Sequence, residues 1–95
     1  MIKHIVLFKF KEASQDVIDT VVSQLRNLEG KVESLRSIEV GVDLIRSERS
    51  YDVALITTFD NMDGLQAYQV HPEHVKVSDY IGTVKESTIA VDYEY

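Results

Sequence analysis

Three histidines and one tyrosine are the residues of this chain best suited to chemistry. His4 lies near the N-terminus, and Tyr68, His71 and His74 lie within the stretch YQVHPEH. An imidazole titrates near neutral pH, so a histidine held in an apolar pocket can move a proton. A tyrosine hydroxyl in the same pocket can donate a hydrogen bond to an oxygen that gains negative charge during a reaction. The chain has no cysteine, which excludes a thiolate nucleophile and a disulfide framework.

These residues allow three interpretations. In the first, His4 and Tyr68 are satisfied core residues and His71-Pro72 is a junction between two helices. In the second, the three histidines hold a metal ion with one open coordination position. Because His71 and His74 flank a proline and lack the H-E-x-x-H and H-x-x-E-H spacings, we expect no metal site. In the third, the histidines perform acid–base chemistry, which needs neither a nucleophile nor a cofactor.

Length and charge limit the classes of protein to consider. Ninety-five residues form a single domain, residues 1–95, and 10 basic against 16 acidic residues give a net charge of −6. The basic cluster Lys3, Lys9 and Lys11 alternates with apolar residues, so we expect no nucleic-acid partner. The apolar run from Ile5 to Phe8 is too short to cross a membrane, and no signal-peptide cleavage site follows it. We therefore expect a soluble cytoplasmic protein.

The hydrophobic pattern predicts strands and helices in a definite order. Residues 2–11 alternate as a strand that is apolar on both faces, and an apolar stripe from Val17 to Leu28 has helical spacing. Ser14 can cap the start of this helix and Gly30 can end it. Alternation returns over residues 37–44, and residues 51–60 are rich in β-branched and aromatic side chains. The polar stretch 45–50 between them is typical of a loop.

The second half of the chain continues with a broken helix and a last strand. Asp60 or Asn61 can cap a helix that contains Leu65 and Tyr68 on one side. Pro72 disfavours helical geometry at His71 but suits the first turn of a new helix, which we expect to run to about Ile81. Residues 88–95 alternate again, with Thr88, Ala90, Asp92 and Glu94 on one face.

The order of elements is β-α-β-β-α-β, which indicates an α+β, ferredoxin-like fold with a four-stranded antiparallel sheet. Both helical segments then cover one face of the sheet. Ile5 and Leu7 lie on the other face, and a bare apolar face of that size is unusual in a stable monomer. A second copy packed face to face would cover it, so we expect a homodimer in the form of a dimeric α+β barrel.

If His4 lies on the face that the helices cover, then His4, Tyr68 and His74 converge between the sheet and the helices. In the acid–base interpretation, these three residues are catalytic and the pocket holds a small apolar or carbonyl-containing ligand. The residues expected to bind this ligand are Val6, Phe8, Leu25, Leu65, His71, Val77 and Ile81.

The segments IKHIVLFKF, HPEH and VDYEY together resemble the stress-responsive A/B barrel (Dabb) family over essentially the whole chain. The resemblance implies a dimeric α+β barrel. One branch of the family, similar to plant olivetolic acid cyclase, closes a linear tetraketide-CoA by an intramolecular aldol condensation. The resemblance to this branch implies that His74 is the general base and that His4 and Tyr68 orient and stabilise the enolate. Cyclase-type members also contribute a tyrosine from the first helix, whereas the buried side of this helix is entirely apolar.

Two functions follow from these expectations. The first is a cofactor-free enzyme that uses histidine acid–base chemistry on a small, polyketide-like carbonyl compound. The second is a non-catalytic protein that binds a small ligand or serves in a stress response. A cavity that reaches His4 and His74 from solvent favours the first, and a pocket filled by aromatic side chains favours the second.

Overall fold

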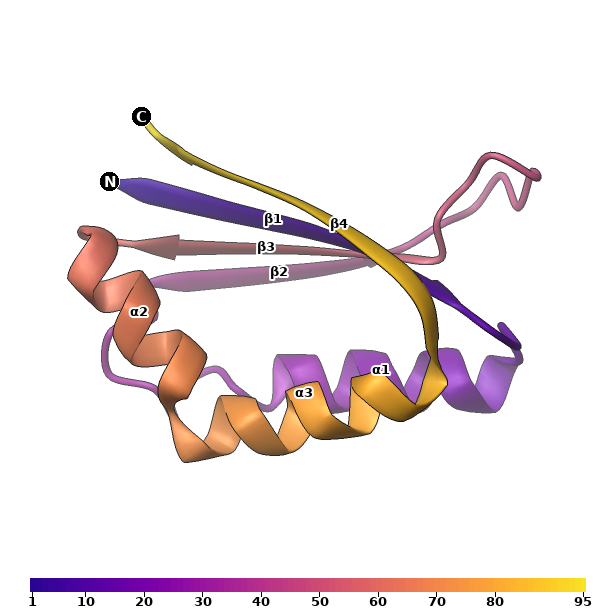
Figure 1. Ribbon diagram of the computed structural model, residues 1–95, viewed down its shortest axis with the longest axis horizontal. Coiled ribbons are helices and arrows are strands. Elements are labelled where there is room, and N and C mark those ends of the chain that lie inside the picture. Colours follow the sequence, from indigo (N-terminus) through magenta and orange to yellow (C-terminus); the bar gives the residue numbers. More distant parts are fainter.

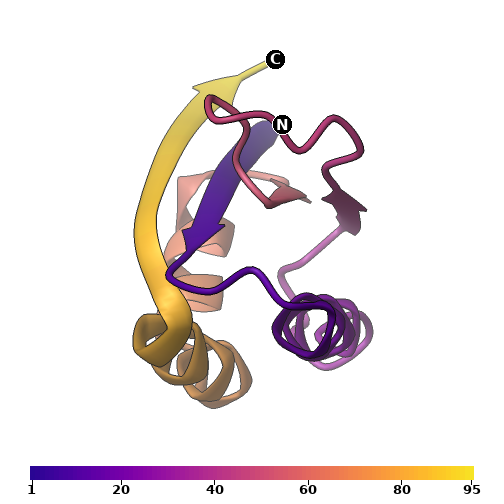
Figure 2. The ribbon, with the colours of Figure 1, turned by 90° about the vertical axis from the view of Figure 1, so that its right-hand side faces the viewer.

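A computed structural model describes residues 1–95 and contains one antiparallel sheet covered on one face by helices. The elements in chain order are β1 (Ile2–Phe10), α1 (Gln15–Arg26), β2 (Ser37–Val42), β3 (Val53–Phe59), α2 (Met62–Val70), α3 (Pro72–Val84) and β4 (Lys85–Glu94). The strands are arranged in the order β2-β3-β1-β4, so the first and last strands of the chain are neighbours. Figures 1 and 2 show α1 and α3 side by side beneath the sheet, with α2 at one end. The ferredoxin-like architecture predicted from the sequence is confirmed.

Local sequence signals set the starts of the helices, whereas α1 ends at Arg26, before the predicted Gly30. The Ser14 hydroxyl accepts a hydrogen bond from the Val17 amide at the start of α1, as predicted. At the start of α2, the side-chain oxygen of Asn61 accepts a hydrogen bond from the Gly64 amide. α2 ends at Val70, with His71 in extended geometry after it, and α3 begins at Pro72, where a missing amide hydrogen has no cost. The histidine–proline step therefore is the junction between two helices. None of the helices is long and apolar enough to cross a lipid bilayer.

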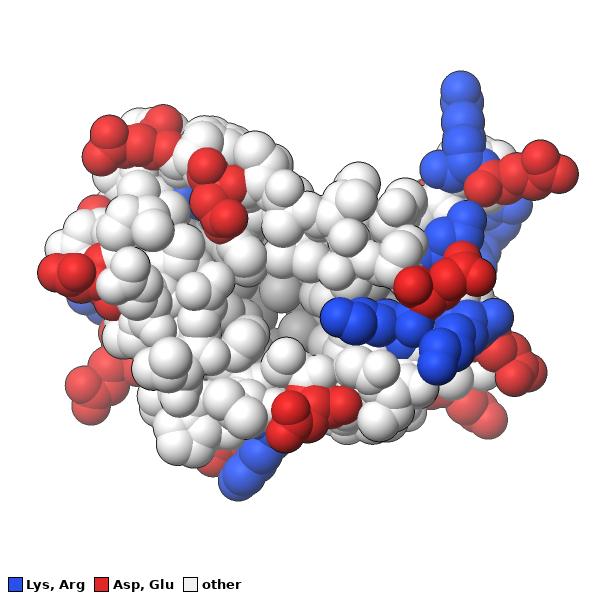
Figure 3. Space-filling view, in the orientation of Figure 1, with Lys and Arg blue, Asp and Glu red and all other residues white.

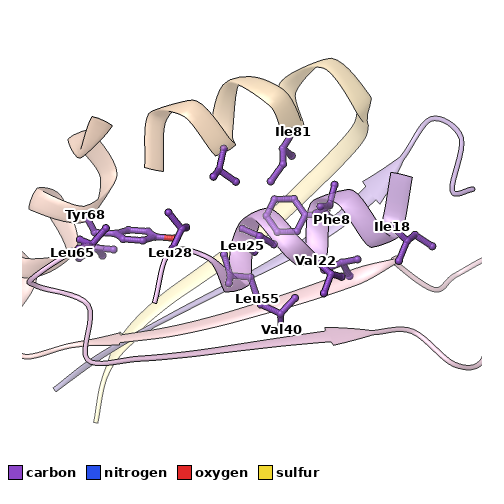
Figure 4. Close-up of a cluster of buried hydrophobic side chains, with 14 of the residues drawn as sticks. Phe8, Ile18, Val22, Leu25, Leu28, Val40, Leu55, Leu65, Tyr68 and Ile81 are labelled. Carbon is purple, nitrogen blue, oxygen red and sulfur yellow. The ribbon is translucent and has the colours of Figure 1, made fainter. Parts of the chain in front are cut away.

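The hydrophobic core lies between the sheet and the helices. Alternate residues of β1 point into it, from Ile2 through Phe8 to Phe10, and the buried side of α1 packs against them. Figure 4 shows Phe8, Leu25, Leu55 and Ile81 directed toward one another from four different elements. His4 belongs to the same face of β1 as Phe8 and is only 8% exposed. His4 therefore lies on the face of the sheet that the helices cover, which is the condition for His4 and His74 to meet.

The opposite face of the sheet carries no helix (Figures 1 and 2). In β4, Ile89, Val91 and Tyr93 are 51%, 53% and 42% exposed. They lie opposite Leu7, Ile5 and Lys3 of β1, so the two strands together form a continuous and mainly apolar surface. We call these β1 and β4 residues, together with Ile56 and Ala54 of β3, the open face.

Strand ends differ from the predicted ones at the β2–β3 connection and at β4. β2 stops at Val42 instead of residue 44, because the Asp43 carboxylate accepts a hydrogen bond from the Arg46 amide and closes a turn. β3 starts at Val53 instead of residue 51. The buried Asp52 carboxylate is held by the Phe10 amide and by Arg46. β4 starts at Lys85, directly after α3 and before the predicted residue 88.

Candidate active site

Two imidazoles approach the core from different elements. His4 is part of β1, and His74 lies in the first turn of α3, whose start is set by the break at His71-Pro72. The Tyr68 ring of α2 contacts both. Its centroid is 6.4 Å from that of His4 and 4.4 Å from that of His74. Three residues from three different elements therefore form one cluster between the sheet and the helices.

Asp92 of β4 holds His4 in place. It lies directly opposite His4 in the antiparallel pairing of β1 and β4, and its carboxylate hydrogen-bonds the Nδ1 atom of His4. A carboxylate can only accept from a neutral or charged imidazole, so Nδ1 carries the proton. The second ring nitrogen, Nε2, has no hydrogen-bond partner within the chain. Asp92 thus fixes both the tautomer and the orientation of His4.

His74 is fixed in the same tautomer by a backbone carbonyl. Its Nδ1 lies 3.1 Å from the Gln69 carbonyl oxygen, which can only accept, so Nδ1 donates and Nε2 keeps its lone pair. Burial lowers the pKa of His74 from its usual value, with smaller contributions from the nearby His4 and His71, while the bond to Gln69 opposes the shift. A lowered pKa keeps the ring neutral at physiological pH. His74 is therefore equipped to accept a proton on Nε2.

Tyr68 is completely buried, and its hydroxyl is the single buried side-chain polar atom without a hydrogen-bond partner. Figure 4 shows the ring beside Leu65 with its oxygen directed into the core toward Leu28. Burial raises the pKa of Tyr68 to about 12, so the hydroxyl keeps its proton. A buried donor without a partner costs about 1–3 kcal/mol of stability. Such a group requires a structural or functional explanation.

A cavity of about 170 Å³ reaches both imidazoles. It extends between β1, β4 and α3, with α1 as part of its wall. Its lining consists of His4, Val6, Phe8, Leu25, Leu55, His74, Val77, Ser78, Ile81, Lys85 and Thr88. Figure 3 shows that this side of the molecule is hollowed between β4 and the helices. Ser78, Lys85 and Thr88 are exposed and His4 is buried, so the cavity runs inward from solvent to the imidazoles.

Most of the residues expected to bind a ligand line this cavity together with the two histidines: Val6, Phe8, Leu25, Val77 and Ile81. Three of the predicted site residues are not part of its wall. Tyr68 contacts the imidazoles from within the core, and Leu65 is a fully packed core residue beside it. His71 caps α3, where its Nδ1 accepts a hydrogen bond from the Glu73 amide, and it borders a separate surface depression.

The cavity residues outside the predicted set, and Asp92 beside them, carry only partial signals in the sequence. Ser78 lies one helical turn after His74, and Thr88 and Asp92 belong to one face of the last strand. Nothing in the sequence paired that face with His4. No pattern in the sequence indicates that Lys85 lines the cavity. The structure contains no group of three or more His, Cys, Asp or Glu side chains arranged to hold a metal ion.

The comparison with known protein families agrees with this architecture. The model of the stress-responsive A/B barrel domain matches residues 2–95. The chain belongs to the stress-responsive A/B barrel family. The resemblance carried by IKHIVLFKF, HPEH and VDYEY is thereby confirmed.

The proteins similar to this chain include a named enzyme and proteins described only by their domain or fold. A stress-response A/B barrel domain-containing protein of Arabidopsis thaliana is 32% identical, over 96% of this chain and 83% of the relative. Olivetolic acid cyclase of Cannabis sativa is 25% identical, over 97% of this chain and 94% of the enzyme. Among solved structures, a dimeric protein with a ferredoxin-like fold from Bacteroides fragilis is 35% identical, with a TM-score of 0.89 over 99% of this chain and 95% of that one.

Proposed function

We propose that this A/B barrel protein is an enzyme that removes a proton from a carbon next to a carbonyl group, with His74 as the general base. The observation that carries the proposal is that His74 lines a solvent-connected cavity while its Nδ1–H is engaged by Gln69. The unprotonated Nε2 is then the nitrogen left to act on a ligand. Imidazole accepts the proton itself, so the step needs no cofactor.

The proposed step transfers one proton from a carbon of the substrate to His74 and needs no other reactant. Nε2 takes the proton as the C–H bond breaks, its electron pair forms the double bond to the carbonyl carbon, and the carbonyl oxygen becomes an enolate. Donors near this oxygen stabilise the transition state, most strongly where water is excluded. The Tyr68 hydroxyl is one candidate donor, and His4 is a second in its imidazolium form, with Nδ1–H bonded to Asp92 and Nε2–H left to donate. The enolate can then be reprotonated or can attack a second carbonyl, as in an aldol condensation.

The relatives support an enzyme without naming a substrate for this chain. Olivetolic acid cyclase is a named enzyme that matches nearly the whole chain. A cavity of about 150 Å³ accommodates one benzene molecule, so the space beside His74 suits compact carbonyl compounds. The apolar wall provided by α1 favours compounds with a hydrocarbon portion.

A second candidate function is ligand binding without turnover. It is favoured by the six hydrophobic residues that make up the larger part of the cavity lining. Both candidates predict a ligand in the same place, and only the first predicts proton transfer. Incubating the protein with small ketones and diketones in deuterium oxide separates them. We expect deuterium incorporation next to the carbonyl, measured by NMR, to exceed that in buffer; saturable binding without incorporation would instead support the second candidate.

The proposed working form is a homodimer joined through the open face. Exposed apolar side chains gather there, and patches of this kind mark interaction sites. A solved relative with 35% identity is dimeric. The open face also has a depression of about 280 Å³, where the small residues Gly41 and Ala54 lie opposite each other. This depression leaves room for side chains of a second copy.

A further inference from the structure

A β-bulge in β4 directs a lysine toward the cavity. Lys9 pairs with Ser87, but the next residue, Phe10, pairs with Lys85, so Glu86 is left without a partner in β1. In regular alternation, Glu86 would share the face of Thr88 and Lys85 would point to the other face. The extra residue reverses this order and brings Lys85 to the side of Phe10 and the core. The cavity is consequently bordered by a cation at a position where unbroken pairing would place a carboxylate.

Two hydroxyl groups and no carboxylate share the opening of the cavity with Lys85. Ser78 of α3 and Thr88 of β4 line the cavity with it. No acidic side chain lies within ion-pair distance of Lys85, whereas Lys76, Arg36 and Arg46 each pair with a carboxylate. Figure 3 shows basic side chains on the side of the hollow where α3 runs into β4. In a chain with a net charge of −6, this is a local site suited to an anion.

Lys85 lies at one end of the cavity and the imidazoles of His4 and His74 lie at the other. Thr88 lies opposite Phe8 and Asp92 lies opposite His4, so four residues of β4 separate the two ends, about 13 Å along an extended strand. On α3, Ser78 follows His74 by one turn, about 6 Å. The wall between the ends is apolar. The arrangement matches a molecule with an anionic group at one end, a hydrocarbon middle and a carbonyl group at the other end.

We propose that Lys85, with Ser78 and Thr88, binds the carboxylate of an oxo acid whose carbonyl group lies at His4 and His74. The inference rests on the proposed function for the position of the carbonyl group, and it adds the substrate class. A lysine ammonium and two hydroxyls supply up to five donor hydrogens for the two carboxylate oxygens. Charge-assisted hydrogen bonds of this kind are stronger than neutral ones, and added salt weakens them.

Binding of 7-oxooctanoate and its longer homologues, which are methyl ketones with a terminal carboxylate far enough from the carbonyl group to span the cavity, tests the proposal against their methyl esters. Affinities are measured by NMR titration of the intact protein at low and high salt. We expect the acids to bind about three- to tenfold more tightly than the esters, with the preference reduced by salt. Lys85→Met should remove the preference by weakening the acids alone, and Lys85→Arg should retain it. Lys11→Met, which removes an exposed charge near the α3–β4 junction, is the matched control and should change little.

The outcomes separate this inference from the proposed function. Equal affinities for acids and esters in the unmodified protein, or equal weakening of both by Lys85→Met, would overturn the carboxylate site. Deuterium exchange in the bound ketone is followed in the same samples. Lys85-dependent binding of the acids without exchange would support the carboxylate site and contradict the proton-transfer function. Exchange without a preference for acids would support the proton-transfer function and contradict the carboxylate site.

Discussion

Asp92 and His4 are direct cross-strand neighbours, and the carboxylate of the first hydrogen-bonds Nδ1 of the second. This contact joins the last strand of the chain to the first and orients the deeper of the two imidazoles in the cavity. His4 can present Nε2 to a ligand only while Asp92 keeps Nδ1 occupied. The pair therefore links strand register directly to the chemistry proposed for the site.

Replacing Asp92 by Asn should lower the rate of deuterium exchange by about tenfold or more, since the amide holds His4 less firmly and in either tautomer. The imidazole nitrogen chemical shifts of His4 report the tautomer independently of activity. Glu94→Gln changes a carboxylate at the next position on the same face and should affect neither quantity. An unchanged exchange rate in Asp92→Asn would show that this contact is only structural.

The Tyr68 hydroxyl leads to a prediction in which stability and activity move in opposite directions. Tyr68→Phe removes a buried donor that has no partner, so the free energy of unfolding should rise by about 1 kcal/mol. If the hydroxyl donates to the enolate, exchange should fall by about tenfold. Denaturant unfolding and exchange measurements on the same sample check both changes. A variant that is less stable and equally active would show that the hydroxyl has neither role.

The lowered pKa of His74 predicts the pH dependence of activity. The base form of His74 is present above its folded-state pKa, which lies below the usual value of about 6.5. Exchange should therefore rise with pH and reach its plateau with an apparent pKa below that of a free histidine. A profile with its midpoint above about 6.5 would contradict a neutral His74 acting as the base.

The same shift predicts a pH dependence of stability. Because the folded state disfavours protonated His74, the unfolded state binds more protons as pH falls below about 6.5. The contribution of His74 to stability is present above that value and is lost as pH falls through the lower folded-state pKa. Denaturant midpoints of the original protein should fall more steeply across this window than those of His74→Gln. Parallel curves would show that the two states bind the proton equally.

Homodimer formation through the open face predicts that Val91→Glu produces a monomer at micromolar concentration. The substitution introduces a charge into the middle of an apolar interface, where an unpaired carboxylate is strongly unfavourable. Val70→Glu on α2, at a valine that is 75% exposed and away from the open face, is the matched control and should remain dimeric. Light scattering distinguishes the two masses. A monomer in the unmodified protein, or a dimer with Val91→Glu, would contradict the proposed interface.

The elements of the fold follow from local signals in the sequence. Strand alternation in β1, the Ser14 cap and the break at His71-Pro72 depend on neighbouring residues, so their positions could be predicted to within a few residues. The order of these elements, together with the apolar alternation of β1, predicted that His4, Tyr68 and His74 would cluster if the helices covered the face of β1 that carries His4. The structure meets that condition.

The polar residues around this cluster depend on long-range pairing, which the sequence does not display. Asp92 acquires its role from the register of β4 against β1, and one residue of slippage would turn it to the other face. Lys85 reaches the cavity because of a bulge that no local signal marks. The end of β2 at Val42 similarly depends on how Asp43 and Arg46 close the following turn.

The most direct test of His74 as the general base is the rate of deuterium exchange in a bound ketone, measured by NMR for His74→Gln and His71→Asn side by side. Asparagine is a favoured N-cap residue, so His71→Asn keeps the start of α3 while removing a nearby imidazole that lies outside the cavity. We predict that His74→Gln lowers the rate by about 10²–10⁴-fold with the fold intact by circular dichroism, and that His71→Asn leaves it within about twofold. Equal rates in the two variants would contradict His74 as the base.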